Sequence, residues 1–295
     1  MPKPRESTLG KFLGWLKGAA RAAACCLVGG VCVAQARADE LVQFESAVAK
    51  PTPFQQRIAQ QNGKALQAVH GQLLNAYLTR PPGNAPFPAV VALPGCSGVS
   101  GSSKKTWPER LSSWGYVVLV VDSFSLRGIK ETCDRLHFVD RVGDAYGALG
   151  FLSKYSFVDP RRIALIGFSA GGNAALEAVQ LGGAEELMER KFKAAIAYYP
   201  DCSGLNGGMA VPTLILIGEL DDAFSAKKCQ EMVAGSNGKG SAVQLEVFKG
   251  ARHAFDSPGL KTGSEHYGYT MEYNAAAAEK SVSDVQVFLE QTLGG

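Results

Sequence analysis

The sequence of 295 residues has few charged residues, 19% of the total, and no excess of either sign over most of its length. Six basic residues and a single acidic residue lie in positions 1–38, which leaves 24 basic and 26 acidic residues in the rest of the chain. A chain with this balance lacks the basic surface that binding to nucleic acid requires. It also lacks internal repeats, low-complexity tracts and linkers, and its hydrophobic content of 46% excludes a disordered chain. We therefore predict a single globular domain over residues 39–295.

The apolar segment near the N-terminus is too short to cross a membrane. It covers residues 22–33, about a dozen residues, whereas a membrane-spanning helix needs roughly 20. A basic stretch that ends at Arg21 precedes it, and Ala36 and Ala38 place small residues at positions −3 and −1 of a cleavage site. This layout predicts a secretory signal peptide over residues 1–38 and a periplasmic or secreted protein without a stable membrane anchor. An amphipathic N-terminal helix is the alternative.

Cysteines are few in the chain that export would leave. Three of the seven lie within residues 1–38, and the others are Cys96, Cys133, Cys202 and Cys229. Four thiols allow three pairings, and an oxidising compartment favours disulfides. We predict a Cys202–Cys229 disulfide, because each cysteine lies just beyond a predicted strand in adjacent βα units. A Cys96–Cys133 disulfide follows by elimination, and four unpaired thiols are the alternative.

Short continuous apolar runs alternate with helix-like segments from residue 70 onward. Such runs, rich in Val and Ile, are typical of strands that are covered on both faces. The predicted strands are residues 70–78, 89–93, 116–121, 163–166, 194–199 and 213–217, together with 243–248, whose alternating pattern indicates a position nearer the sheet edge. The predicted helices are residues 105–114, 138–155, 171–181 and 223–233, and a final helix with an apolar stripe from Val282 to Leu293. This succession predicts an α/β fold with a mainly parallel central sheet and helices on both faces.

A G-x-S-x-G motif occupies residues 167–171, between a predicted strand and a predicted helix. In that context the motif forms a tight turn that lifts the serine hydroxyl above the sheet, and its glycines stand where side chains would collide. We predict Ser169 as the nucleophile. The backbone N–H of Ala170, at the helix N-terminus, is predicted to donate to the oxyanion. A glycine–serine turn with a purely geometric role is the alternative.

A serine hydroxyl is a poor nucleophile without a base, and only four histidines are available. His70 and His137 precede the serine, and His266 has no predicted strand immediately before it. His253 follows the predicted strand at 243–248, in the order that this fold requires. We therefore predict His253 as the general base.

The acid that orients the histidine is expected in the turn after the strand at 213–217. That turn reads Gly-Glu-Leu-Asp-Asp, and Asp221 holds the third place after the glycine. We predict Asp221 as the orienting acid, ahead of Asp222 and Glu219. A carboxylate there would fix the imidazole tautomer and stabilise the imidazolium that forms during attack.

The second oxyanion donor is expected in the loop after the strand at 89–93. This loop reads Pro-Gly-Cys-Ser-Gly, and we predict the N–H of Cys96 as the donor. Cys96 is a poor candidate nucleophile, because no strand-to-helix turn surrounds it. The loops at residues 122–133 and 256–273 are expected to set specificity. Four aromatic residues are candidates to line the substrate pocket: Phe124, Phe168, Tyr199 and Phe255.

Five segments contain these motifs in one order: Leu93–Gly98, Gly167–Gly172, Gly218–Asp222, Gly250–Phe255 and Tyr273–Ala278. In that order they resemble the dienelactone hydrolase family of the α/β-hydrolase fold, over roughly residues 65–292. The resemblance implies a Ser/Asp/His hydrolase that acts on a small-molecule ester or lactone and uses no metal or organic cofactor. Two positions depart from the family's pattern. Ser169 stands where dienelactone-cleaving members have a cysteine, and Pro94 stands where many relatives have a histidine.

The combined prediction is a serine hydrolase that cleaves a carboxylic ester or lactone through an acyl-enzyme formed on Ser169. Two other functions fit the same residues. One is an acyltransferase that uses the three residues with an acceptor other than water. The other is a non-catalytic exported binding protein, because a fold does not fix a function.

Overall fold

The computed structural model describes residues 37–48, 70–134 and 138–294. The predicted signal peptide lies outside the described residues, except for the backbone of Arg37 and Ala38. The described residues belong to one compact unit, Ala34–Gly295. The single domain over residues 39–295 stays a prediction.

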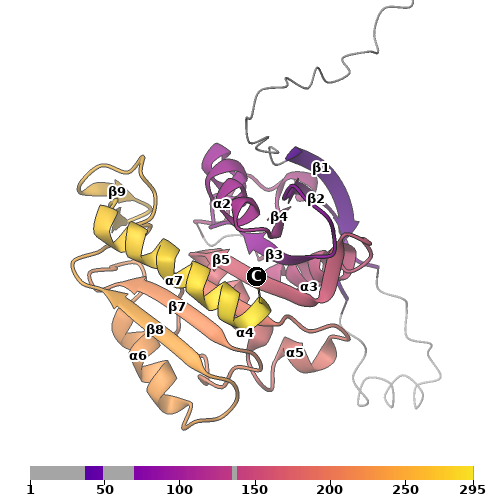
Figure 1. The fold of residues 1–295 in the computed structure, drawn as a ribbon. Coiled ribbons are helices and arrows are strands. Elements are labelled where there is room, and N and C mark those ends of the chain that lie inside the picture. The colour runs from indigo at the N-terminus through magenta and orange to yellow at the C-terminus, as the bar shows by residue number, and fades with distance from the viewer. Residues whose placement is uncertain (1–36, 49–69, 135–137, 295) are drawn as a thin grey trace, which may run out of the picture. The chain divides into compact units, whose positions relative to one another are not determined.

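An eight-stranded sheet forms the centre of the described part of the chain, with strand order β1-β2-β4-β3-β5-β6-β7-β8 (Figure 1). From β4 to β8 every neighbouring pair is parallel, and the antiparallel pairs are β1–β2 and β2–β4. The prediction of a mainly parallel sheet is therefore confirmed. The strands are β1 (Arg37–Glu45), β2 (Leu73–Arg80), β3 (Phe87–Leu93), β4 (Val117–Asp122), β5 (Val158–Phe168), β6 (Ala194–Tyr198), β7 (Thr213–Gly218) and β8 (Val243–Phe248).

Helices cover both faces of the sheet. Helix α7 (Ala275–Leu293) crosses β5, β6 and β7 at the front of Figure 1, and α3 (Arg141–Leu152) packs against α4 (Ala170–Val179). The other helices are α2 (Gly101–Ser113), the short α5 (Ala184–Leu187), α6 (Ala226–Gly235) and a 3-10 turn η1 (Ser125–Arg127). A two-stranded hairpin of β9 (Ser264–His266) and β10 (Tyr269–Met271) lies outside the main sheet.

Burial follows strand position. All six residues of β4 and of β7 are buried, which explains their uninterrupted apolar sequences. Among the described strands β8 ends the sheet order, next to β7, and its residues alternate between half-buried and exposed until Phe248. The predicted position of this strand near the sheet edge is confirmed.

Several boundaries differ from the prediction for local reasons. Strand β2 begins at Leu73 rather than at residue 70, and a side chain at Gly71 would meet the Ser46 carbonyl oxygen at 2.0 Å. Helix α6 begins at Ala226 rather than at residue 223, because the N–H groups of Ala223 and Phe224 donate to the Asp221 carboxylate in a preceding turn. Strands β1, β9 and β10 were not predicted.

Two disulfides join the four cysteines outside the predicted signal peptide. Cys96 is bonded to Cys133 and Cys202 to Cys229. This is the pairing predicted from strand positions, and the alternative of four unpaired thiols is wrong for this structure.

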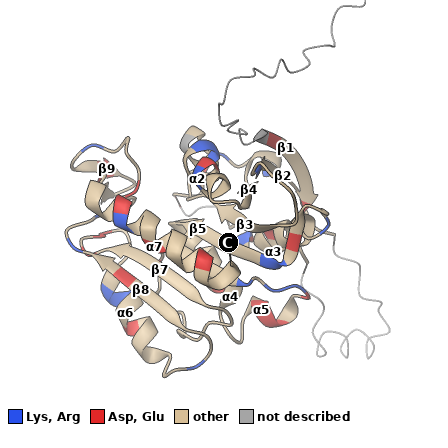
Figure 2. Cartoon of the chain, viewed as in Figure 1, with Lys and Arg blue, Asp and Glu red and all other residues tan. Residues whose placement is uncertain are grey.

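Charged residues of both signs are interspersed over the helices and loops in Figure 2. The ion pairs that they form include Arg127 with Asp144, and Asp159 with Arg161 and Arg162. Within the residues that the structure describes, no helix is both long and apolar enough to span a membrane.

Candidate active site

Ser169 lies on a sharp turn between β5 and α4. Its backbone has φ 53° and ψ −120°, a strained conformation for a residue with a side chain. A side chain at Gly167 would meet the Gly171 carbonyl oxygen at 2.0 Å, and one at Gly171 would meet the Leu93 carbonyl oxygen at 2.2 Å. Neither position therefore has room for a side chain, as the motif predicts.

The three predicted triad side chains form one hydrogen-bonded chain. His253 Nε2 lies 2.9 Å from Ser169 Oγ, and His253 Nδ1 lies 2.8 Å from Asp221 Oδ2. They come from the ends of three parallel strands, β5, β7 and β8, whose carboxyl ends meet at one edge of the sheet. Both Asp221 and His253 are buried, so their hydrogen bond is shielded from water.

Local contacts separate Asp221 from the neighbouring carboxylates. Asp221 Oδ1 accepts hydrogen bonds from the N–H groups of Ala223 and Phe224, which leaves Oδ2 directed at the imidazole. Asp222 instead accepts from the N–H and hydroxyl of Thr270, and Glu219 accepts from the N–H of Gly250. Of the three candidate acids, the structure brings Asp221 to His253.

The imidazole of His253 lies among aromatic rings. The rings of Tyr199, Phe224 and Tyr269 are 4.7, 5.5 and 5.2 Å from it, centroid to centroid, and each presents an edge-to-face geometry. These contacts restrict the rotation of the ring and keep its two nitrogens directed at Ser169 and Asp221.

The two predicted oxyanion donors come from two segments next to Ser169: Ala170 follows it in the chain, and Cys96 lines the same pocket. Ala170 is the first residue of α4, so its N–H has no acceptor within the helix. Cys96 lies in the loop after β3, and its carbonyl oxygen accepts from the Thr132 N–H at 2.8 Å. The preceding Pro94 carbonyl oxygen accepts from the guanidinium of Arg141. Burial lowers the pKa of Arg141 to about 10, against the opposing effect of Asp144.

Comparisons with known proteins agree with this geometry. The sequence profile described as "Dienelactone hydrolase family" matches residues 74–293, about three quarters of the chain. The chain belongs to the dienelactone hydrolase family. Membership places it among the carboxylic ester hydrolases, and the family resemblance predicted from the sequence is confirmed.

Individual relatives are more distant. The chain is 27% identical over 208 residues to Lipase 1 of Moraxella sp. (strain TA144), a match that covers 68% of the chain and 58% of the lipase. It is 23% identical over 245 residues to a protein of Bradyrhizobium sp named as a probable 2-oxo-3-(5-oxofuran-2-ylidene)propanoate lactonase, covering 77% of the chain and 93% of that protein. The crystal structure of the dienelactone hydrolase-like promiscuous phosphotriesterase P91, from metagenomic libraries, superposes with a TM-score of 0.61 at 19% identity. This superposition covers 88% of the chain and 100% of that structure, and it shows a shared fold.

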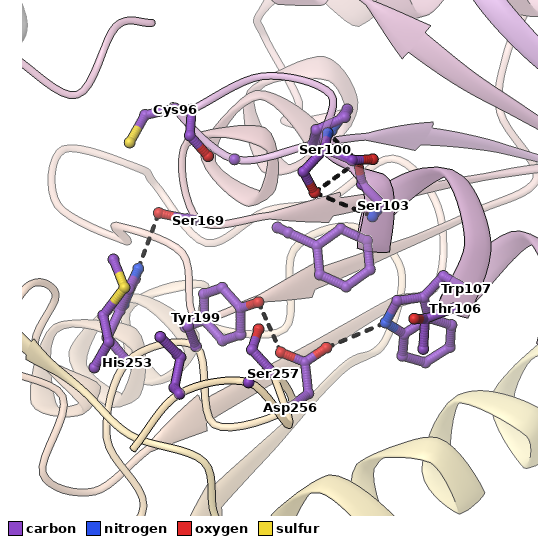
Figure 3. Close-up of a pocket in the computed structure, with 18 of the residues that line it drawn as sticks. Cys96, Ser100, Ser103, Thr106, Trp107, Ser169, Tyr199, His253, Asp256 and Ser257 are labelled. Atoms are coloured by element: carbon purple, nitrogen blue, oxygen red, sulfur yellow. Dashed lines mark hydrogen bonds between the residues drawn. The ribbon is translucent and has the colours of Figure 1, made fainter. Parts of the chain in front are cut away.

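In this family member a pocket with a volume of about 440 Å³ opens beside Ser169. Its wall comes from the loop after β3, from α2, and from the segment between His253 and Met271 (Figure 3). The lining side chains include Cys96, Ser97, Ser100, Ser103, Thr106, Trp107, Phe168, Ser169, Tyr199, His253, Asp256, Ser257, Leu260, Tyr267, Tyr269 and Met271. The predicted specificity loop at 256–273 therefore contributes to the wall, whereas residues 122–133 do not.

Two of the four predicted lining aromatics, Phe168 and Tyr199, lie in the pocket wall. Phe124 and Phe255 do not. The ring of Phe255 is fully buried against Tyr198, Tyr199 and Phe248. The ring of Phe124 is buried beside the loop after β3, where it would be the nearest contact of a side chain at Gly98.

The sequence reasoning missed two pocket residues that contact each other. The indole N–H of Trp107, on α2, donates to Asp256 Oδ2 at 3.1 Å, and the Tyr199 hydroxyl donates to Oδ1 at 2.8 Å. Asp256 stands only three residues after His253, so its nearness to the site was the one signal available. Among the residues that the structure describes, no three His, Cys, Asp or Glu side chains gather as ligands of a metal ion.

Proposed function

We propose that this chain is a serine hydrolase that cleaves a carboxylic ester or lactone by two-step acyl transfer to water. Ser169 is the nucleophile, His253 the general base and Asp221 the orienting acid. The observation that supports the proposal most directly is the continuous chain of hydrogen bonds from Ser169 Oγ through the imidazole to Asp221, at 2.9 and 2.8 Å. Such a chain can take the hydroxyl proton as the oxygen attacks.

In the first step the Ser169 oxygen forms a bond to the substrate's carbonyl carbon, and His253 Nε2 takes the hydroxyl proton. The tetrahedral intermediate then collapses, the alcohol oxygen leaves with the proton from His253, and an acyl-enzyme remains on Ser169. In the second step His253 takes a proton from water, whose oxygen attacks the acyl carbon. Release of the carboxylic acid returns the proton to Ser169.

The negative charge on the carbonyl oxygen is stabilised by the N–H groups of Cys96 and Ala170. Their positions support this role, since Cys96 follows β3 and lines the pocket with Ser169, and Ala170 begins α4 directly after Ser169. Removal of one such donor from a comparable site lowers kcat by about 100-fold to 1000-fold. The strained backbone of Ser169 is consistent with a turn that keeps the hydroxyl exposed to substrate.

The proposal includes export of the chain and removal of residues 1–38. The disulfides support it besides the signal-like N-terminus. Both pairs of cysteines are bonded, and structural disulfides persist in oxidising compartments. We place the active enzyme in the periplasm or outside the cell.

Labelling with an alkyl fluorophosphonate tests the proposed nucleophile. The chain from Asp39, with both disulfides formed, is treated with the reagent, and the modified peptide is located by mass spectrometry. We expect one adduct per chain, on Ser169, with release of fluoride, and no adduct in Ser169→Ala.

His253→Gln should lower the labelling rate by about 100-fold or more, because the general base is lost. His266→Gln serves as the matched control, since His266 is exposed on β9 and contacts none of the three side chains by hydrogen bond. A folded protein that is not labelled, or that is labelled at another residue, would contradict the proposed mechanism.

A further inference from the structure

Asp256 is a carboxylate in the wall of the pocket that the proposed mechanism does not use. Figure 3 shows it below Ser169, between Tyr199 and Trp107. Each of its oxygens accepts one hydrogen bond from another side chain, from the Tyr199 hydroxyl and from the Trp107 indole N–H. Burial raises the pKa of Asp256, while both of these hydrogen bonds oppose that effect and favour the charged form.

The carboxylate has acceptor capacity that the protein leaves unused. A carboxylate offers about four lone-pair positions, and the Tyr199 hydroxyl, the Trp107 indole N–H and the backbone N–H of Asp256 itself occupy three of them. Asp256 is partly accessible and lines the pocket, so its remaining capacity faces the space that a substrate would fill.

No positive charge balances Asp256 inside the pocket. The described residues of the pocket wall include neither lysine nor arginine. The cation that acts on Asp256 most directly is Arg110, and its guanidinium lies over the ring of Trp107, 5.1 Å from the centroid. Arg110 does not belong to the wall, so the described wall holds the acidic side chain of Asp256 and no lysine or arginine.

The rest of the wall is rich in aromatic rings. Trp107, Phe168, Tyr199, Tyr267 and Tyr269 all line the pocket. The face of an aromatic ring attracts a cation within about 6 Å of its centroid, and tryptophan does so most strongly. A carboxylate among several aromatic rings is a combination that favours a positively charged ligand and repels a negative one.

We propose that Asp256 determines specificity and that the pocket selects esters that carry a cationic group over esters that carry a carboxylate. This inference rests on the proposed ester hydrolysis at Ser169. The cationic group lies beside Asp256 and the aromatic wall while the ester carbonyl lies at Ser169. A carboxylate in the same place meets a like charge, with no basic side chain in the wall to compensate it.

Three phenyl esters of equal length test the charge preference. Their acids end in a trimethylammonium group, a tert-butyl group or a carboxylate; the first two have nearly the same shape and differ in charge. For the wild-type chain we expect kcat/KM to be about tenfold higher for the trimethylammonium ester than for its tert-butyl isostere. The carboxylate ester should be about tenfold or more below the isostere.

Asp256→Asn removes the charge and keeps the size. Its amide oxygen can accept from the Trp107 indole N–H, and its NH2 group can donate to the Tyr199 hydroxyl, which can reverse its role. The ratios between the three esters, measured within the variant, should fall to about threefold or less. Asp222→Asn is the matched control, because Asp222 is a carboxylate near the site that does not line the pocket, and it should keep the wild-type ratios.

The outcomes separate the two proposals. Equal kcat/KM for the three esters in the wild-type chain would overturn the inference, whether or not the Asn variant folds. Retention of the ranking in a folded Asp256→Asn protein would overturn the role of Asp256. Absence of turnover for every ester, together with absence of labelling at Ser169, would instead count against the proposed hydrolase function.

Discussion

The turn that holds Ser169 depends on positions where no side chain fits. The backbone of α4 lies too close to Gly167 to leave room for a side chain. The backbone at the end of β3, just before the loop that contains Cys96, lies similarly close to Gly171. The contact at Gly171 matters for function, because it fixes the distance between α4 and the loop after β3. One glycine thus couples the positions of the two predicted donors.

Gly171→Ala should therefore lower both stability and activity. The added methyl group would lie 2.2 Å from the Leu93 carbonyl oxygen and 2.5 Å from that of Pro94, and these backbone atoms can move apart only if α4 shifts. We expect a loss of about 3 kcal/mol in the free energy of unfolding, measured in urea, and a lower kcat.

Gly150→Ala is a suitable control for this substitution. Gly150 lies within α3, and a methyl group there would meet nothing within 4 Å. Because glycine is a poor helix former, this variant should gain about 0.5 to 1 kcal/mol. Similar effects of the two substitutions would contradict the steric explanation.

The hydrogen bonds of Asp159, at the start of β5, should stabilise the fold at neutral pH but not at strongly acidic pH. Its hydrogen bonds with Arg161, and also with Arg162, lower its pKa from 3.8 to about 2. The stability that these bonds supply is complete above the unfolded value of 3.8 and disappears as the pH falls towards 2. Because Arg161 is largely exposed, we expect Asp159→Asn to cost only about 1 kcal/mol at pH 7.

Urea unfolding of wild type and Asp159→Asn at pH 7 and at pH 2.5 measures this dependence. The difference between the two proteins should shrink by more than half at the lower pH. A difference that stays the same at both values would show that the carboxylate charge is not its source.

The helices and strands that could be predicted from the sequence are those that a local residue pattern determines. The buried strands were predicted because β3, β4, β6, β7 and the second half of β5 are continuous apolar runs. Ser169 was predicted because it follows such a run, and His253 because it follows the alternating strand β8. Trp107 and Asp256 were missed because their hydrogen bond joins residues 149 positions apart, and no local pattern records it. Strand β1 was missed because its residues are mixed in polarity, with Leu41 exposed and Phe44 buried.

The loop after β3 should depend on the disulfide that ties it to the Cys133 segment. Cys96 bears a predicted oxyanion donor and is joined to that segment both by the disulfide and by the hydrogen bond from Thr132. Replacing Cys96 and Cys133 together by alanine keeps the Cys96 N–H but frees the loop. We expect a fall in kcat of about tenfold, measured with a soluble ester below the unfolding transition.

The second disulfide supplies the comparison. Cys202 and Cys229 close a loop of similar length away from the pocket wall, so removal of either disulfide should cost about 2 to 4 kcal/mol of stability. Loss of the Cys202–Cys229 pair should leave kcat within about twofold. An equal fall in kcat for both double variants would mean that the effect is general and not specific to the loop after β3.

In the folded molecule, the proposed cleavage after Ala38 must leave the pairing of β1 with the central sheet intact. Strand β1 begins at Arg37, and its pairing with β2 is irregular between Arg37 and Glu40. From Glu40 to Glu45 the pairing is continuous, opposite Leu78 to Leu73. Cleavage after Ala38 would therefore remove the pair before the irregularity and leave the continuous part of the strand intact.

Expression of the full chain in a bacterium with a periplasm, followed by N-terminal sequencing of the protein recovered there, should give a first residue of Asp39.

The same chain cut back to Ser46 should be less stable by about 3 kcal/mol, because it loses β1 and with it the buried Phe44 ring, which lies 5.7 Å from that of Phe151. The chain from Asp39 retains both features and provides the reference. Recovery of an uncut chain, or a cut beyond Glu40 without loss of stability, would contradict this account of processing, since the strand after the cleavage site would then contribute nothing to the fold.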